Sequence, residues 1–85
     1  MNEAELRRRA RARIEVGMLP SSRPVRSFAG MGSGERCALC DVPINRNEIE
    51  DEIEVVQGEA LRVLKFHRPC ASAWALERTQ ERGGS

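Results

Sequence analysis

Two short motifs contain the residues best able to do chemistry in this chain. Cys37-Ala-Leu-Cys40 and His67-Arg-Pro-Cys70 each pair two metal-ligand side chains with two residues between them, and 26 residues separate the motifs. Together they use all three cysteines and the only histidine. Zinc prefers thiolate and imidazole ligands, and four of them form a closed tetrahedral structural site. The pattern predicts one structural zinc ion bound by Cys37, Cys40, His67 and Cys70.

Each motif taken alone has a less specific interpretation. A Cys-x-x-Cys pair can be a redox motif, but the βαβ context of thioredoxin-like sites is missing around Cys37. A lone histidine such as His67 is more often solvated or in a core than a ligand, and a lone cysteine such as Cys70 is more often a small buried apolar residue. Three cysteines cannot all pair within one chain, which disfavours a disulfide framework. The joint spacing favours a metal, with iron as an open alternative to zinc.

A catalytic role for this site is not expected. Catalytic zinc sites usually keep one position open for water, whereas four protein ligands close this one. The chain has no second histidine, and no nucleophile motif is visible. The Gly-rich segment 31–34 neither follows a predicted strand nor matches a phosphate-binding loop. We therefore expect no enzymatic activity and no small-molecule substrate.

The two ligand pairs must be brought together by the elements between and after them. Residues 49–56 and 61–66 are β-branched and partly alternating, and Gln57-Gly58-Glu59 lies between them, which predicts a hairpin. Pro69 is typical of the first turn of a helix, and residues 71–82 continue that helix. Its inward face is expected to carry Trp74 into the core, together with Cys70, Ala73 and Glu77. Residues 36–82 are therefore predicted to form the zinc-binding domain, with 83–85 as a tail.

The first 35 residues are expected to contain a helix and a linker. Residues 1–17 predict an Arg-rich helix that begins at Asn2, has Glu5 in the capping-box position and ends at Gly17. Residues 18–35 are rich in Pro, Ser and Gly and are interpreted as a linker. The predicted fold class is α+β: a basic N-terminal helix precedes a small zinc-stabilised domain of zinc knuckle, β-hairpin and C-terminal helix.

Composition and charge limit the size of the core and the kind of partner. With 85 residues, two Phe, one Trp and no Tyr, the chain buries little apolar surface and needs an additional stabilising element such as a bound metal. The net charge is +1, but residues 1–36 carry eight basic and four acidic groups, and residues 37–85 carry six and nine. The N-terminus lacks an apolar signal region and no stretch is long enough for a membrane span. We therefore expect a soluble cytoplasmic protein.

The segment 37–74 resembles the LIM and poly(ADP-ribose) polymerase-type zinc fingers, which belong to the treble-clef group. It shares with them the order of Cys-x-x-Cys, a long insert, His-x-x-Cys and an aromatic residue, here Trp74, on the following helix. The polymerase-type finger is closer in insert length and in the Val42-Pro43-Ile44 segment. The chain also resembles small uncharacterised bacterial proteins with a Gly-Ser-Gly segment before such a knuckle. The resemblance implies a treble-clef-like fold without fixing a partner.

Two functions stay open at this point. As in LIM domains, the module is expected to bind protein as an interaction or regulatory adaptor. The opposite charges of the two halves predict that the basic helix docks on the acidic strand 49–56, in its own chain or in a homodimer. The alternative is nucleic-acid binding, which the polymerase-type resemblance implies. Its contacts would be the basic residues of the N-terminal helix, because the carboxylates of 48–54 would repel phosphate: Arg7, Arg8, Arg9, Arg11 and Arg13.

Overall fold

The computed structural model describes residues 1–80, so residues 81–82 of the predicted C-terminal helix and the predicted tail 83–85 lie outside the described residues. The elements follow in the order α1 (Glu3–Glu15), β1 (Pro24–Met31), β2 (Ile49–Gln57), β3 (Ala60–His67) and α2 (Arg68–Arg78). The three strands form one antiparallel sheet in the order β1-β2-β3. This is the predicted α+β class.

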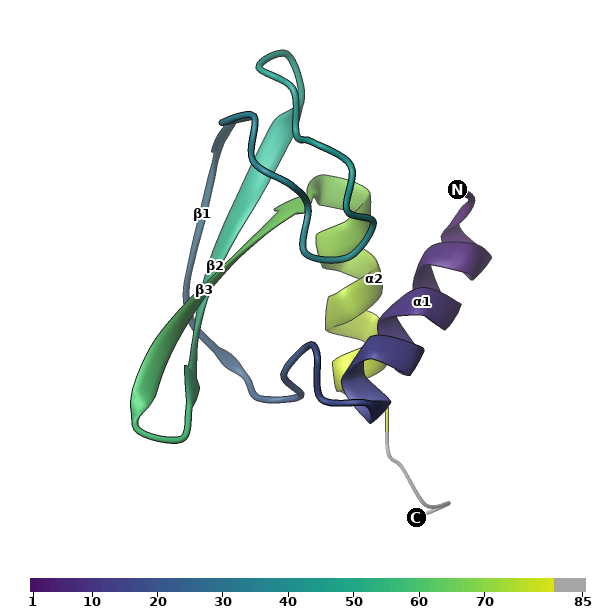
Figure 1. Ribbon diagram of the computed structural model, residues 1–85, viewed down its shortest axis with the longest axis vertical. Coiled ribbons are helices and arrows are strands. Elements are labelled where there is room, and N and C mark those ends of the chain that lie inside the picture. The colour runs from purple at the N-terminus through teal and green to yellow at the C-terminus, as the bar shows by residue number, and fades with distance from the viewer. Residues whose placement is uncertain (81–85) are drawn as a thin grey trace.

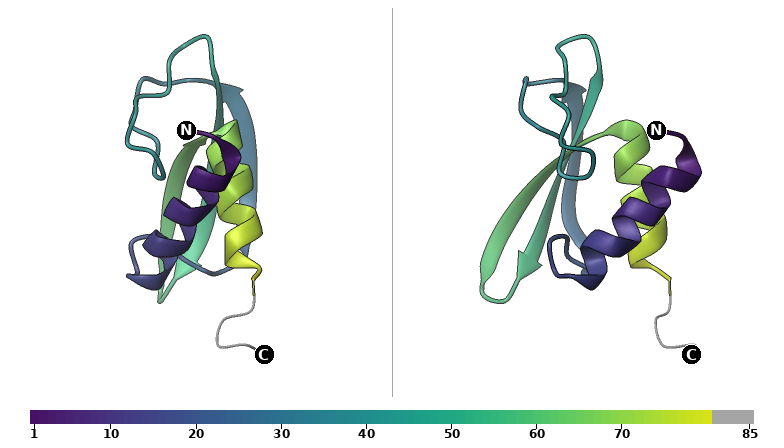
Figure 2. Two further views of the ribbon diagram at one scale, coloured as in Figure 1. Left: turned by 90° about the vertical axis from the view of Figure 1, so that its right-hand side faces the viewer. Right: turned by 45° about the vertical axis from the view of Figure 1, so that its right-hand side comes forward.

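Helix α2 lies between the sheet and α1, so the molecule has three layers (Figure 1). Figure 2 shows the same stacking from two other sides, with α1 outermost. The core between the sheet and α2 contains Phe66 and Trp74, whose rings stack with centroids 5.5 Å apart. The indole Nε1–H of Trp74 donates to the carbonyl oxygen of Pro20 at 2.9 Å, so the polar atom of this buried side chain is satisfied.

The predicted hairpin is confirmed, with each strand one or two residues longer than expected. Strands β2 and β3 pair directly, and Gly58 in the turn has a φ of +66°. Ile53, Val55 and Leu64 point from these strands into the core. The second helix is confirmed, with Trp74 and Glu77 fully buried on its inward face, but it ends at Arg78, so residues 79–80 of the predicted helix lie beyond its end.

The interpretation of residues 18–35 as a linker is wrong for Pro24–Met31, which form strand β1. This strand pairs with β2 from Met31–Ile49 to Pro24–Val55, with a bulge between Pro24 and Arg26. Its stability comes from the ladder with a strand distant in sequence, because seven of its eight side chains are exposed. A strand with little burial on either face leaves no alternating apolar pattern in the sequence.

Helix α1 begins and ends as its sequence predicts. Asn2 and Glu5 form the capping box, with Asn2 accepting from the Glu5 N–H at 2.9 Å. At the other end, Gly17 has a φ of +81°, and Gly17 and Met18 donate to Ile14 and Arg13, which is a Schellman ending. Leu6 and Ala10 are buried toward the rest of the molecule. Within residues 1–80, no helix is both long and apolar enough to cross a bilayer.

The Gly-rich segment 31–34 serves the fold. A Cβ atom on Gly32 would lie 1.9 Å from the carbonyl oxygen of Asn45, so only glycine fits where this segment crosses the backbone that precedes β2. The next residue, Ser33, donates its backbone N–H and its hydroxyl to the buried carboxylate of Glu50, at 3.1 and 2.6 Å. These contacts fix the chain immediately before the first cysteine.

Candidate metal centre

The first ligand pair lies on a tight loop, the knuckle (residues 36–43). Arg36 and Pro43 close the loop by an antiparallel bridge. Inside it, the Cys37 N–H donates to Val42 at 3.0 Å and the Asp41 N–H donates to Cys37 at 3.0 Å. Asp41 takes a φ of +66°, which completes the turn. The loop thereby directs the sulfurs of Cys37 and Cys40 to the same side.

The second ligand pair lies where β3 passes directly into α2. His67 is the last residue of β3 and the N-cap of the helix, and Cys70 follows in the first helical turn. The Ala38 N–H of the knuckle donates to the Lys65 carbonyl at 2.8 Å, which ties the knuckle to β3. The two motifs, separated by 26 residues in sequence, therefore face each other.

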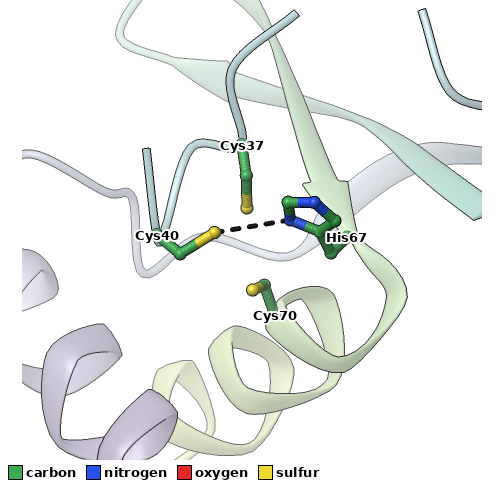
Figure 3. A group of neighbouring side chains, drawn as sticks. All are labelled: Cys37, Cys40, His67 and Cys70. Atoms are coloured by element: carbon green, nitrogen blue, oxygen red, sulfur yellow. Dashed lines mark hydrogen bonds between the residues drawn. The ribbon is translucent and has the colours of Figure 1, made fainter. Parts of the chain in front are cut away.

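The four predicted ligands converge (Figure 3). Their ligand atoms all lie within 4.8 Å of one another, and Cys40 Sγ lies 3.4 Å from His67 Nδ1. Zn–S and Zn–N bonds of about 2.3 and 2.0 Å in a tetrahedron require ligand separations of about 3.5–3.8 Å. The cluster therefore fits one tetrahedral metal ion after shifts of about 1 Å or less.

Hydrogen bonds around the cluster orient the ligands for a metal. The Leu39 N–H points to Cys37 Sγ at 3.4 Å. His67 turns its Nε2 to the Pro43 carbonyl at 3.3 Å and to the Glu48 carboxylate at 3.5 Å. A ligating histidine usually donates its second ring N–H to such an acceptor, which leaves the other nitrogen free for the metal. Nδ1 of His67 is therefore the ring nitrogen available to a metal, a detail that the sequence motif does not contain.

The protonation equilibria of the cluster show how strongly the sulfurs interact. A hydrogen bond from Cys70 lowers the pKa of Cys37 to about 4, and the same bond raises the pKa of Cys70. Burial raises the pKa of Cys40. Burial also lowers the pKa of His67, but the hydrogen bond and charge of Cys37 outweigh it and leave that pKa above its usual value. A divalent cation that binds the cluster would displace the protons that remain on its thiols.

The cations near the ligands in sequence are bound elsewhere. Arg36, Lys65 and Arg68 could offset the charge of three thiolates, but within residues 1–80 their side chains bind other groups. Arg36 donates to the Asp41 carbonyl at 2.8 Å, Lys65 pairs with Glu35, and Arg68 pairs with the Asp51 carboxylate at 3.1 Å. Each cation flanks a ligand in sequence, but its long side chain reaches a nearer acceptor.

Two arginines of α1 support the knuckle instead. Arg9 donates to the Leu39 carbonyl at 2.7 Å, and Arg13 donates to the Ala38 carbonyl at 3.1 Å. Both also pair with the carboxylate of Asp41, at 2.9 and 2.7 Å. The hydrogen bond from Arg13 holds the pKa of Asp41 below its usual value. Ala38 and Leu39 are the two residues between the knuckle cysteines. Helix α1 is therefore hydrogen-bonded to the loop that carries two of the four predicted ligands.

Two further arginines of α1 bind the buried carboxylate on α2. Arg7 Nε donates to one oxygen of Glu77 at 2.8 Å and Arg11 Nε donates to the other at 3.0 Å. The remaining candidate, Arg8, is exposed and makes no hydrogen bond or ion pair within residues 1–80. The predicted docking of the basic helix on the acidic strand of its own chain is therefore wrong. Helix α2 separates α1 from the sheet, and the arginines reach Glu77 and Asp41.

We expect the double substitution Arg9→Ala and Arg13→Ala to weaken metal binding by about tenfold, the lower end of the effect of outer-shell residues. The physical reason is that the carbonyls of Ala38 and Leu39 lose their hydrogen-bond donors. The knuckle then gains conformational freedom, which metal binding must remove. Competition with a chromogenic zinc chelator measures the affinity. The matched control is Arg8→Ala, on the same helix and without these bonds. Equal affinity in the double variant and the control would contradict this role of α1.

Comparison with protein-family models, with curated proteins and with solved structures gave no match. The assignment of a metal centre therefore depends on the geometry and chemistry of the four side chains.

Proposed function

We propose that the chain binds one zinc ion through Cys37, Cys40, His67 and Cys70, and that this ion is structural. The convergence of four sulfur and nitrogen donors within 4.8 Å supports the proposal. Three thiolates and one imidazole match the preference of zinc over harder cations, which favour oxygen. When bound, the ion supplies a cross-link between the knuckle and the start of α2. Because four protein ligands complete a tetrahedron, the site is not catalytic in this proposal.

The fold around the site is proposed to be of the treble-clef type. A knuckle with the first ligand pair, a β-hairpin and a helix that begins with the second pair follow one another in the order that the resemblance to LIM and poly(ADP-ribose) polymerase-type fingers implies. Strand β1 and helix α1 are additions that the resemblance does not contain. They cover the edge of β2 and the outer face of α2.

We further propose that the zinc module acts by binding protein, as an interaction or regulatory adaptor, rather than by binding nucleic acid. Four of the five candidate arginines are committed to Glu77, Asp41 and knuckle carbonyls. A basic residue that already neutralises a carboxylate releases few counterions when it meets phosphate. The face of β2 that carries Glu52 and Glu54 would repel a nucleic-acid backbone. The internal use of the arginines is the observation that favours this choice.

Metal content and cobalt substitution test the zinc proposal. Protein purified without added metal is expected to contain one zinc per chain. Its cobalt derivative is expected to show the thiolate charge-transfer and tetrahedral d–d bands of a Cys₃His site. Cys40→Ser should weaken the charge-transfer band, whereas Ser72→Ala, at an exposed position on α2, should leave it unchanged. Purified protein that is folded and metal-free, or that contains iron, would overturn the assignment.

A further inference from the structure

Within residues 1–80, the outer edge of strand β1 pairs with no other strand. The Gly32 N–H donates to the Glu48 carbonyl at 2.9 Å, so this pair is a hydrogen-bonded pair of the antiparallel ladder. Hydrogen bonding alternates along such a ladder, so Arg26, Phe28 and Gly30 direct their backbone groups to β2. Ser27 and Ala29 therefore direct their N–H and C=O groups away from the sheet.

The other edge of the sheet is different. By the same alternation Lys65 of β3 faces away from β2, and its carbonyl accepts the Ala38 N–H of the knuckle at 2.8 Å. The knuckle thus covers the end of β3 near the metal site. Along β1 only Arg26 is charged, and the proline and the bulge both lie at its start, so the part from Arg26 to Met31 has few of the devices that usually protect an edge strand from pairing.

The exposed apolar side chains of β1 are arranged symmetrically about its centre. Val25, Phe28 and Met31 are 55%, 49% and 64% exposed, and Phe28 lies midway between the other two. An antiparallel second copy centred on Phe28 would bring the two phenylalanines opposite each other on one face of the sheet, and would bring Met31 of one copy near Val25, the bulge residue, of the other. Ser27 and Ala29 would then form the hydrogen-bonded pairs, and the Phe28 pair would be the close, non-hydrogen-bonded one.

The space around Gly30 agrees with the same register. Arg26 of one copy would lie opposite Gly30 of the other, where an added Cβ atom would meet no other part of residues 1–80 within 4 Å. Gly30 neighbours Glu50 on β2, and Glu52 and Glu54 continue the same face. Arg26 pairs with Glu54 of its own chain at 3.2 Å, so in this register its side chain would extend over the gap at Gly30 of the other copy. Any other register would separate the apolar side chains or place Arg26 away from this gap.

We propose that β1 is a self-association edge, through which two copies of this chain join antiparallel into one six-stranded sheet. This rests on the proposed function as a protein-interaction module and names its partner as a second copy. The symmetric contact is a closed, two-fold one, since each copy offers the same strand. The aligned apolar residues account for three exposed side chains that the fold of a single chain leaves without a role.

The test is the mass in solution of the full-length, zinc-loaded chain. Light scattering at roughly 100 µM, where even a micromolar dimer is almost fully formed, should give twice the 9.5 kDa of one chain. Phe28→Lys places two like charges opposite each other and should raise the dissociation constant at least about tenfold. The matched control is Val63→Lys, an equally exposed position on the same sheet face but on the other edge, which should stay dimeric.

A second variant keeps the test valid if Phe28→Lys does not fold. Ala29→Pro removes an N–H that faces away from β2, so the internal ladder keeps its bonds while the open edge loses a donor. It should also raise the dissociation constant, measured for both variants over a dilution series, with unchanged Trp74 fluorescence. A monomeric, zinc-loaded wild type would overturn self-association and leave the zinc proposal standing. Equal weakening by Val63→Lys and Phe28→Lys would overturn the assignment to β1. A folded dimer without zinc would instead overturn the metal proposal alone.

Discussion

Removing the metal is expected to unfold the chain, and Cys70→Ser should have the same result. Structural zinc sites of this type contribute on the order of 10–16 kcal/mol, whereas a small domain has a net stability of about 5–15 kcal/mol. The apolar core here is small: Phe66 and Trp74 are its only buried aromatic side chains within residues 1–80. In the proposed site the metal joins the knuckle to α2, and both helix α1 and strand β3 contact the knuckle. Loss of the ion therefore releases contacts in every layer.

Trp74 makes this loss measurable. Its ring is buried against Phe66 and its indole N–H is bonded to Pro20, so unfolding should shift its emission to longer wavelength. Titration with a strong chelator should produce this shift together with loss of helical circular dichroism, and added zinc should reverse both. Ser72→Ala is the control for Cys70→Ser, two positions along the same helix. A chelated, metal-free chain that keeps its fluorescence and circular dichroism would refute the structural role of the ion.

The parts of the fold that local sequence determines were predictable. The hairpin followed from β-branched runs around Gly58, and α1 followed from Asn2, Glu5 and Gly17, because each signal acts through neighbours within a few residues. Strand β1 was not predictable, because its stability depends on pairing with β2, about 25 residues away, and its side chains carry no burial pattern. Long-range pairing of an exposed strand leaves little trace in the sequence.

The convergence of the four candidate donors was predictable, but their surroundings were not. Cysteine and histidine spacing restricts the candidate ligands to four residues, since few arrangements bring such pairs together. The hydrogen-bond partners of the site depend on how the loop and α1 meet in three dimensions. His67 faces the acceptors Pro43 and Glu48. The knuckle accepts from Arg9 and Arg13. One signal was available: Glu77 lies on the buried face of α2, and a buried carboxylate requires a cation. The i,i+4 spacing of Arg7 and Arg11 matches that need.

Glu77 is the polar centre of the contact between the two helices. Its side chain is fully buried, whereas Arg7 and Arg11 are 36% and 50% exposed, so the carboxylate depends more on this contact than the arginines do. Burial alone would raise the pKa of Glu77, but the hydrogen bonds from Arg11 and Arg7 outweigh it and hold the pKa below its ordinary value of 4.5. The folded state therefore favours the charged carboxylate, and the two arginines provide that preference.

Glu77→Gln is accordingly expected to destabilise the zinc-loaded protein by about 2–3 kcal/mol at pH 7, the cost of breaking a buried charged network whose cations can partly rehydrate. The amide keeps the volume of the side chain, but its NH₂ group faces one of the two arginine donors, and two donors cannot form a hydrogen bond with each other. Urea unfolding followed by Trp74 fluorescence measures the effect. Glu59→Gln, at an exposed position in the hairpin turn, is the matched control and should be nearly neutral. Comparable stability of the two variants would refute the role assigned to Glu77.

The pH dependence and a second substitution separate the charge from the packing. Because the folded-state pKa of Glu77 is depressed, its contribution is fully present above pH 4.5 and is lost as the pH falls through the folded-state pKa. The stability gap between wild type and Glu77→Gln should thus be constant from about pH 7 to 5.5 and narrow at lower pH. Arg7→Ala should also cost less in the Glu77→Gln background than in wild type, since the two residues share one interaction. Additive losses would mean that α1 is held by Leu6 and Ala10 rather than by its arginines.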